Sequence, residues 1–545
     1  MGYCLSVVSR WAGSRGGFRI VVAALLLLAA AGVLQDSSGT AGAATPTLFV
    51  APGGSDAGVC SRVAPCASFG RAYQVAVPGS VVEVAAGSYP RQTLVFDPSK
   101  TSSLDVVFRP AVGAAVTLAE FATGANRVRV GAQHFELRDF TVSSYVRLWW
   151  GSEDVTLRNI DAAGIDFASA RDVRVLGGDF GPLVDQVSHV RSCGEPGCYP
   201  AEDILIEGAL FHDYTISYAD KHSECLMIWP GRRVTIRNST FRNCTDFDVF
   251  VKPGYELRFE NNFFDEPMPG DSATVECNPN CPRGGPALSF SDGSGMTVRY
   301  NSFLGAIRLD PEVAGPNSFT GNAGRAAGCW TNATFTYNLW SNTRCSRTDR
   351  RAQLTRVFVD PTSSGFDLRL RQGSPAIGAG DPLSAPRTDI EGRVRPSALA
   401  ADAGAWQREP ALARSGRSLG TAAMRMSRAA VREWYGTPRR RLVIDGPKPG
   451  QKIQVDSYAI RGGRLRVHYA DDRVVAISTT SRYYRTSGAL GPGAALLARG
   501  SEKRECRRVG KSGLWVRPTR GSKPVVAELI VTARSYTPPC GKPKP

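Results

Sequence analysis

Short runs of alternating apolar and polar residues recur through the middle of the chain. Each run reaches an asparagine, aspartate or glycine and is followed by a second short run of β-prone residues. Alternation with a period of two predicts a strand with one buried side, and asparagine and glycine tolerate the left-handed backbone of a sharp corner. The pattern therefore predicts strand, corner and strand, repeated. The predicted corner residues are Asp139, Asn159, Gly177, Gly208, Asn238, Asn261, Asn301 and Asn338.

The spacing of these corners predicts a coil. Successive corners lie 20, 18, 31, 30, 23, 40 and 37 residues apart, and the last interval has room for one more corner at Asn322. A base period of about twenty residues with insertions is typical of a solenoid of stacked parallel strands. The alternative is a β-sandwich, which needs frequent hairpin turns, but Asn-Gly and Asp-Gly turns are scarce here. We therefore expect an all-β parallel β-helix.

Residues 1–43 have the pattern of an export signal peptide. Arg10, Arg15 and Arg19 precede an uncharged apolar run at 20–34, and the small residues at 41–43 fit a cleavage site. An uncleaved membrane anchor is the alternative, but this run is shorter than the ~20 residues that a spanning helix needs. We expect the mature chain to be secreted, either extracellular or associated with the cell wall.

The cysteine pattern fits an oxidising compartment. Twelve of the thirteen cysteines follow the signal segment, and disulfides are the natural expectation for an exported chain. Zinc is the competing interpretation for the closely spaced Cys277 and Cys281, although no histidine lies near them. Sequence order does not fix connectivity. Pairing of close neighbours gives Cys60–Cys66, Cys193–Cys198, Cys225–Cys244, Cys277–Cys281, Cys329–Cys345 and Cys506–Cys540.

The two ends of the coil region resemble a known family. Residues 48–56 (LFVAPGGSD), with 64–69, 76–84 and 87–89, look like the N-terminal cap of secreted right-handed parallel β-helix proteins of the pectate-lyase-like superfamily. The segments 368–378, 389–393 and 403–405 resemble its closing region. The resemblance implies a right-handed parallel β-helix over 44–406, with an amphipathic helix near Phe69–Val77 covering its open end. It implies little about chemistry, because the superfamily contains lyases, hydrolases, epimerases and non-enzymatic binders.

Charge marks a second domain at the C-terminal end. Residues 411–545 contain 28 basic and 8 acidic residues, a net charge of +20, whereas 44–410 is mildly acidic. We expect a linker at 407–420 and a small basic α+β domain at 421–545, which loosely resembles β-lactamase-inhibitor-like envelope modules. The predicted elements are a helix at Thr421–Tyr435 and strands at Lys452–Ile460, Arg464–Tyr469 and Arg473–Thr480.

The basic surface of that domain allows two interpretations. It binds an anionic cell-wall polymer, or it is an ordinary solvated surface. Nucleic acid is the weaker partner, because the chain carries an export signal and lacks a recognised DNA- or RNA-binding module.

The candidate functional residues gather on one stripe of the predicted solenoid. Residues 248–254 align with 225–231 one turn earlier, which places Leu226, Ile228, Val249 and Val251 in the core. The alternate positions should then face outward, and the following turns continue the stripe. The residues expected on it are Cys225, Met227, Trp229, Asp248, Phe250, Lys252, Ser289, Ser291, Asp292, Arg308 and Asp310.

This set of side chains suits β-elimination on a polysaccharide that contains uronic acids. The reaction removes the proton α to a carboxylate, so it needs a base and a cation beside the developing charge. By resemblance to related lyases, Lys252 is the candidate base and Arg308 the neutralising cation. The other candidates are His222 and Glu224 as an acid/base pair, Trp229, Phe250 and Asp292 for substrate binding, and Asp246, Asp248 and Asp310 for Ca²⁺.

Several functions remain open at this stage. A secreted carbohydrate-active enzyme, most specifically a polysaccharide lyase, is the leading hypothesis, and two of the carboxylates can instead serve a glycoside hydrolase. A non-catalytic protein that binds extracellular or cell-wall polysaccharide is the alternative. The charged positions also fit a solvated, salt-bridged surface. The sequence contains no nucleotide-binding glycine loop, no nucleophile elbow and no HExxH helix.

Overall fold

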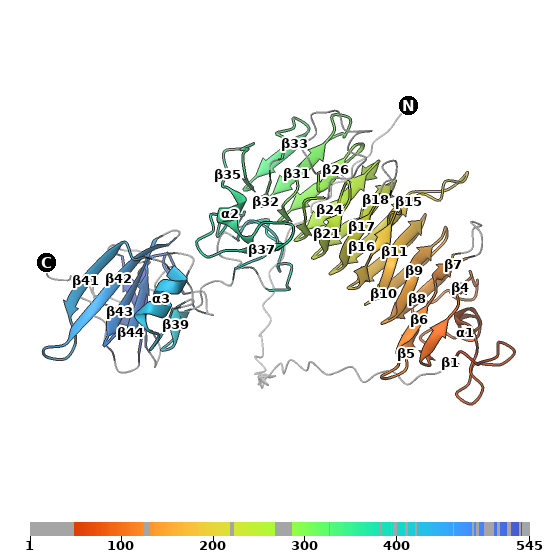
Figure 1. The fold of residues 1–545 in the computed structure, drawn as a ribbon, viewed down its shortest axis with the longest axis horizontal. Helices are drawn as coiled ribbons and strands as arrows, with labels where there is room; N and C mark the ends of the chain where they lie inside the picture. Colours follow the sequence, from red (N-terminus) through yellow and green to blue (C-terminus); the bar gives the residue numbers. More distant parts are fainter. Residues whose placement is uncertain are drawn as a thin grey trace, which may run out of the picture. The chain divides into compact units, whose positions relative to one another are not determined.

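Parallel strands follow one another from residue 48 to residue 351 in the computed structural model, and successive turns stack on each other (Figure 1). These turns form a parallel β-helix, as the sequence predicted. The residues that the structure describes are 48–124, 131–217, 223–267, 286–325, 327–381, 383–393, 395, 401–408, 413–419, 422–435, 437–460, 463–481, 484, 486, 490–494, 506–509, 513–519, 525–533 and 536.

One side of the coil, called sheet A here, takes a strand from almost every turn. All its pairings along the coil are parallel. Its main strands are β1 (Leu48–Val50), β2 (Val81–Val84), β5 (Val106–Pro110), β8 (Gln133–Arg138), β10 (Glu153–Arg158), β12 (Arg171–Leu176), β16 (Ala201–Glu207), β20 (Thr235–Arg237), β24 (Arg258–Glu260), β28 (Thr297–Arg299), β31 (Asn317–Thr320) and β33 (Ala333–Thr336). The short strands β19 (Gly231–Arg232), β23 (Gly254–Tyr255) and β27 (Gly293–Ser294) extend it.

The remaining strands of each turn form two further rows. One row consists of β3 (Gly87–Tyr89), β6 (Val116–Leu118), β13 (Asp179–Phe180), β17 (Leu210–Thr215), β21 (Thr240–Cys244), β25 (Phe263–Phe264), β29 (Ser302–Phe303), β32 (Ala323–Gly324), β34 (Leu339–Trp340) and β35 (Arg350–Arg351), with β14 (Leu183–Val184) beside β17. The other begins with β4 (Gln92–Leu94) and β7 (Phe121–Thr123) and continues through β15 (His189–Arg191), β18 (Leu226–Trp229), β22 (Val249–Val251), β26 (Leu288–Phe290) and β30 (Ile307–Leu309). The long strands β9 (Thr141–Leu148) and β11 (Asp161–Ala168) belong to both rows.

The corner predictions hold for the first six corners and are off by one residue in the later turns. Left-handed backbone occurs at the six predicted corners from Asp139 to Asn261, but Tyr300 and Tyr337 adopt it in place of Asn301 and Asn338. The asparagines there are buried and form a ladder, because each side-chain oxygen accepts a backbone N–H from the turn before. The ladder runs through Asn262, Asn301, Asn322 and Asn338 and ends on Asp349.

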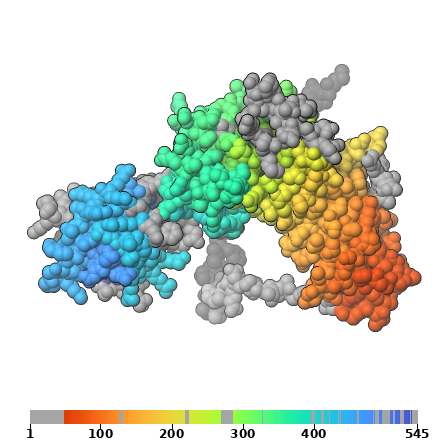
Figure 2. Space-filling view, in the orientation of Figure 1, coloured from red at the N-terminus to blue at the C-terminus, as the bar shows by residue number. Residues whose placement is uncertain are grey.

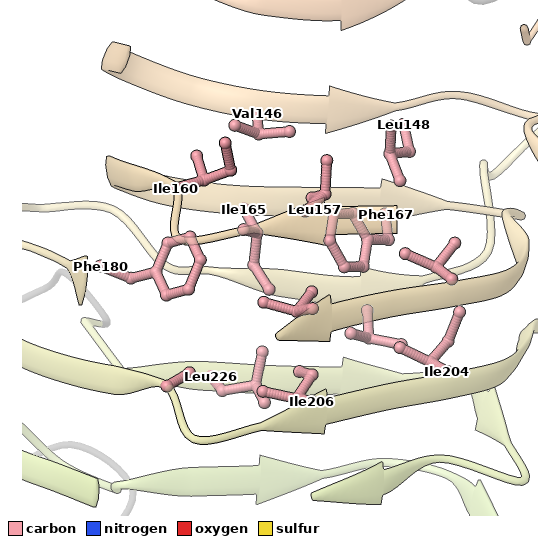
Figure 3. Close-up of a cluster of buried hydrophobic side chains, with 14 of the residues drawn as sticks. Val146, Leu148, Leu157, Ile160, Ile165, Phe167, Phe180, Ile204, Ile206 and Leu226 are labelled. Atoms are coloured by element: carbon pink, nitrogen blue, oxygen red, sulfur yellow. The ribbon is translucent and has the colours of Figure 1, made fainter. Parts of the chain in front are cut away.

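Stacked apolar side chains fill the coil (Figure 3). Phe180, Phe211, Phe241, Phe264 and Phe303 occupy equivalent positions in five turns, with neighbouring ring centroids 4.8–5.1 Å apart. Equivalent residues repeat at the strand spacing of ~4.8 Å in parallel sheets, so identical side chains stack on one another. This regular core holds the outward positions of successive strands in fixed columns.

The N-terminal end of the coil is capped as predicted. Helix α1 (Phe69–Val75) begins after Ser68, whose hydroxyl accepts the N–H of Arg71, and it buries Phe69, Ala72 and Tyr73 against the first turns. The neighbouring loop is closed by the disulfide Cys60–Cys66. Burial of these rings removes the open hydrophobic end of the solenoid from water.

Four of the six expected disulfides are present among the described residues, namely Cys60–Cys66, Cys193–Cys198, Cys225–Cys244 and Cys329–Cys345. Cys506 is also disulfide-bonded, while its expected partner Cys540 lies outside the described residues, as do Cys277 and Cys281. The predicted signal segment 1–43 lies outside them as well. Within the described ranges, no helix is long and apolar enough to cross a membrane.

After the last turn, α2 (Leu354–Val357), β36 (Phe358–Asp360) and β37 (Asp367–Leu370) bury a separate apolar cluster against Leu339. The guanidinium of Arg395, almost wholly buried, fastens the following segment to the coil. It donates to the side chain of Asn261 and to the carbonyls of Gly404 and Ala405, and it lies over the ring of Tyr300 at 4.8 Å. Paired in this way, the buried cation is satisfied.

The C-terminal module is an antiparallel sheet with one helix, α3 (Arg428–Tyr435). Its strands follow the order β41 (Arg440–Asp445), β42 (Lys452–Ile460), β43 (Gly463–Ala470), β44 (Arg473–Thr479), β47 (Val526–Thr532), β46 (Leu514–Pro518) and β45 (Arg507–Arg508). The three strands predicted between 452 and 480 are confirmed as β42, β43 and β44. The flanking strands β41, β45, β46 and β47 were not predicted.

Two predictions at the start of this module are wrong. Residues 413–423 form a small antiparallel sheet of β38 (Ala413–Arg414), β39 (Ser418–Leu419) and β40 (Ala422–Ala423) where a linker and the first part of a helix were expected. Ala413, Leu419 and Ala422 are buried in the core of the module. Burial of these apolar side chains makes the segment part of the domain, and the helix begins only at Arg428.

Candidate functional site

The candidate site lies on the row of strands that contains Trp229. We call the outer side of β9, β11, β15, β18, β22, β26 and β30 the Trp229 face. Pairing registers align one column of outward residues along it, Arg147, Asp166, His189, Met227, Phe250, Ser289 and Arg308. Seven strands at ~4.8 Å spacing extend over roughly 29 Å. In the space-filling view these turns follow one another along the surface from orange to green (Figure 2).

A second column lies two residues further along each strand. Arg191 pairs with Trp229, and the N–H of Lys252 donates to the carbonyl of Ile228, which places Lys252 beside Trp229 on the next turn. Trp229 is 53% exposed, and Lys252 is exposed. Cation, aromatic ring and cation therefore follow one another on three successive turns.

The earlier turns of this face carry an ion-pair cluster centred on Asp166. Its carboxylate is buried and accepts bonds from both ends of the Arg191 guanidinium, at 2.8 and 2.9 Å, and from Arg147 at 3.0 Å. Arg147 also bonds Glu120 at 3.1 Å. A buried carboxylate held by two guanidinium groups is a rigid arrangement, because the bidentate pair fixes both partners.

His189 stands next to Asp166 in the first column and is partly buried. Burial lowers the pKa of its imidazole below the ordinary value of 6.5, and the guanidinium groups of Arg191 and Arg147 act in the same direction, against the opposite pull of Asp166. The imidazole is therefore neutral at pH 7. A neutral imidazole at the edge of a polar cluster has the protonation state of a general base.

Aromatic rings border this cluster. The guanidinium of Arg191 lies 5.9 Å from the ring centroid of Trp149, and that of Arg147 lies 4.4 Å over Tyr145. On the later turns the ring of Phe250 stacks on Phe247 with centroids 5.1 Å apart, and both are partly exposed. Flat apolar surfaces beside polar groups suit the faces and hydroxyl groups of sugar rings.

The pairing register confirms the predicted alignment of 225–231 with 248–254. Leu226, Ile228, Val249 and Val251 are fully buried. Two residues expected to face outward do not. Cys225 is buried in its disulfide with Cys244, and Asp248, one residue before β22, is wholly buried. Period-two alternation applies within a strand and fails at the corner that precedes it.

The predicted catalytic pair is not a free pair of cations. Arg308 lies two strands from Phe250 in the first column, as the sequence implied, and its guanidinium binds Asp310 at 2.7 and 3.2 Å. Lys252 forms no ion pair within the described ranges. Of the other predicted residues, Asp292 is exposed and accepts the N–H of Gly293 at 2.6 Å. His222 lies outside the described residues, and Glu224 is 1% exposed.

The three aspartates predicted as Ca²⁺ ligands do not come together. Asp310 is engaged by Arg308, Asp246 is partly buried, and Asp248 is enclosed at the corner. Burial raises the pKa of Asp248 well above its ordinary value, and nearby Asp265 raises it further. Among the described residues, no group of three or more His, Cys, Asp or Glu side chains is arranged to hold a metal ion. The arrangement does not fit a calcium site built on these three residues.

Asp166, His189, Arg147 and Arg191 were missed by the sequence analysis. Their turns contain the insertion that ends before β15, so no constant period aligns Asp166 with His189. A usable signal was the alternation itself, because Asp166 and His189 each sit at an outward position beside core residues Phe167 and Val190. A charged or polar residue at such a position on adjacent turns marks a possible column.

The comparisons with known proteins do not assign a family. No family model matches the chain, and a search of curated proteins finds no match. Among solved structures, a rhamnogalacturonan lyase aligns at 12% sequence identity with a TM-score of 0.29, covering 58% of this chain and 91% of that chain. The alignment is too distant to support an argument about activity. The parallel β-helix stands on the strand pairing described above.

Proposed function

We propose that this protein acts outside the cell, binds an acidic polysaccharide lengthwise along the Trp229 face and cleaves it by β-elimination. The observation that carries the proposal is the sequence Arg191, Trp229 and Lys252 on three successive turns, with the neutral imidazole of His189 beside it. Successive turns are ~4.8 Å apart, which is comparable to the length of one sugar unit. A polymer along this face meets a repeated set of contacts.

Each residue has a distinct role in this proposal. The ring of Trp229 stacks on a sugar face, and Lys252 holds a uronate carboxylate, since it has no ion-pair partner among the described residues. His189 removes the proton α to that carboxylate. The electron pair forms a double bond to the β-carbon, the bond from that carbon to the glycosidic oxygen breaks, and the departing oxygen takes up a proton. Cations near the carboxylate stabilise the developing negative charge.

This assignment differs from the sequence-based hypothesis for Lys252. That hypothesis made Lys252 the base and Arg308 the cation that neutralises the substrate. Arg308 is held by Asp310, and His189 supplies a neutral nitrogen near Lys252 on the same face. We therefore place the base at His189 and the carboxylate-binding cation at Lys252.

The test is product analysis with the full-length protein over polygalacturonate, alginate and glycosaminoglycans. β-Elimination yields an unsaturated uronate that absorbs in the ultraviolet, and we expect it from at least one polymer. His189→Gln should remove it, while Arg258→Gln, an exposed arginine of sheet A, should not. New reducing ends without unsaturated product would indicate hydrolysis. Binding without any cleavage would leave the protein a polysaccharide binder and overturn the catalytic part of the proposal.

A separate observation favours an adhesive role for the C-terminal module. Arg439, Arg440 and Arg441 are exposed at the start of β41, which is an edge strand of a module rich in basic residues. We propose that this edge attracts anionic cell-wall polymer. Retention of the full chain on purified cell wall should fall as salt shortens the screening length below ~10 Å, and Arg440→Gln/Arg441→Gln should reduce it at low salt. Retention that ignores both salt and the substitutions contradicts this role.

A further inference from the structure

The last turn of the coil forms a basic hollow that the proposed function does not use. The hollow has a volume of about 640 Å³ and is lined by Tyr337, Arg344, Arg347, Thr348, Asp349, Arg350 and Arg351. This volume falls within the range of ~300–1,000 Å³ that is usual for small-molecule sites. The hollow lies at β35 and at the loop before it, on a different row of strands from the Trp229 face.

The four arginines of this hollow share an unusual property. None of them forms an ion pair with a described residue, and all four are exposed. Partial burial lowers the pKa of Arg350, because part of its charge is removed from water. Guanidinium groups gathered without carboxylates repel one another, and an anion placed among them relieves that repulsion.

A second arginine-lined hollow on sheet A provides an internal comparison. Its volume is about 350 Å³, and its lining includes Arg233, Arg237, Arg258 and Arg299. Three of these four are neutralised by carboxylates, since Arg233 binds Asp203, Arg237 binds Glu207 and Arg299 binds Glu260. Arginines on this solenoid are therefore normally balanced within the chain. The basic hollow departs from that rule.

The loop that carries the arginines is held in place by bonds that do not involve their positive charges on acidic groups. Asp349 turns one carboxylate oxygen inward to accept from the backbone and side chain of Asn338, at 2.9 and 3.2 Å. The other oxygen is buried and has no hydrogen-bond partner in the described part of the chain. Arg344 donates to the carbonyl of Arg347 at 2.8 Å, and the disulfide Cys329–Cys345 ties down the same loop. The hollow is thus preformed.

We propose that the basic hollow binds a phosphate or sulfate group, carried on a larger molecule such as a polysaccharide. The guanidinium fork matches the oxygens of such groups with two parallel hydrogen bonds. Four arginines against one aspartate favour a group with more than one negative charge, and the volume leaves room for an attached sugar. This site goes beyond the proposed cleavage activity, because it lies apart from the Trp229 face and requires no turnover.

The test is a binding titration of the full-length protein by calorimetry at low ionic strength. The probes are inorganic phosphate, inorganic sulfate, dextran sulfate and neutral dextran. The key variant is Arg347→Gln/Arg351→Gln, whose side chains donate no hydrogen bond to a described residue, so the loop should keep its structure. The matched control is Arg356→Gln/Arg387→Gln, which removes the same charge from exposed positions outside the hollow.

We expect dextran sulfate to bind, with affinity reduced at least tenfold in the Arg347→Gln/Arg351→Gln variant and unchanged in the control pair. Binding of the inorganic ions with the same dependence would identify the free oxyanion as a sufficient ligand. Dependence on the substitutions for dextran sulfate alone would identify the polymer-borne group. The proposal is overturned if none of the anions binds, if both pairs of substitutions weaken binding equally, or if neutral dextran binds as tightly as dextran sulfate. Thermal melting of both variants checks that each is folded.

Discussion

The outer face of sheet A and the Trp229 face are built on the same coil and expose different chemistry. On sheet A one column alternates in charge along several turns, with Glu207, Arg237, Glu260 and Arg299 on neighbouring strands. These residues neutralise one another at the distance of one strand. On the Trp229 face, the exposed positions include a tryptophan, a lysine without an ion-pair partner in the described ranges and a neutral histidine.

The difference separates structural charge from charge that can act on a ligand. Exposed ion pairs between adjacent strands contribute little free energy each, because solvent screens them, but they leave no net charge for a partner. The polar groups of the Trp229 face include a buried carboxylate that fixes two arginines and a cation that stands alone. Four predictions use sheet A as the reference surface for this face.

The largest expected effect is on turnover. His189→Gln keeps a side chain of similar size but removes the proposed base, and general base catalysis contributes roughly 10²–10⁴-fold to a rate. We expect kcat to fall by about that factor with little change in melting temperature. The reference is Arg258→Gln on sheet A, which should leave kcat unchanged. Equal losses in the two variants would remove the distinction between the faces.

The next effect is on stability. Asp166→Asn withdraws a buried charge from two guanidinium groups, and the loss of a buried, charge-assisted network costs about 1–3 kcal/mol. On sheet A, Asp172 and Arg174 form an exposed pair, each about half exposed, so Asp172→Asn should change the free energy of unfolding by less than about 0.5 kcal/mol. Urea denaturation of both variants measures the contrast. A larger loss for Asp172→Asn than for Asp166→Asn contradicts the account.

A smaller effect is expected on binding. Trp229→Ala removes an exposed ring from the proposed substrate track, and we expect polysaccharide affinity to fall about tenfold, equivalent to ~1.4 kcal/mol. Tyr255 on β23 is also exposed, but it belongs to sheet A. Tyr255→Ala should therefore leave affinity within twofold of the native value. The comparison is made by affinity electrophoresis in gels that contain the polymer.

The smallest effect concerns pH. The pKa of His189 is lowered from 6.5 in the folded protein, so the base stays neutral and kcat/KM should hold constant to a pH below 6.5. The unfolded chain binds a proton near pH 6.5 that the folded state resists, so this residue makes the free energy of unfolding fall as pH drops through that range. His189→Gln should lack this component. An acid limb above pH 6.5 that is also present in unfolding of the variant would assign it to another group.

Much of the fold was predictable because the coil repeats itself. Alternation and the corner residues predicted the parallel strands, and the register of Leu226 with Val249 was correct. The exact corner was not predictable from residue type in the later turns, since asparagine serves both as a left-handed corner and as a buried ladder residue. Tyr300 takes the corner there because Asn301 is needed inside, where it bonds its neighbours.

The candidate site was predictable only where the period was regular. Trp229 and Lys252 were identified because two well-aligned turns carry them, whereas Asp166 and His189 are joined across an insertion of irregular length. The burial of Asp248 depends on the geometry of a corner, which the period of two does not describe. The strands β41 and β45 to β47 are set by long-range antiparallel pairing rather than by a local pattern.

The most direct measurement compares the two faces in one binding experiment. The acidic polysaccharide that gives unsaturated product in the screen is titrated into the native protein, the Trp229→Ala/Lys252→Ala variant and the sheet A variant Tyr255→Ala/Arg258→Ala. Each pair removes one exposed ring and one exposed cation. The account predicts that the first variant loses most of the affinity and the second keeps it. Equal affinity of all three proteins, or a greater loss in the sheet A variant, would contradict the assignment of the Trp229 face as the substrate track.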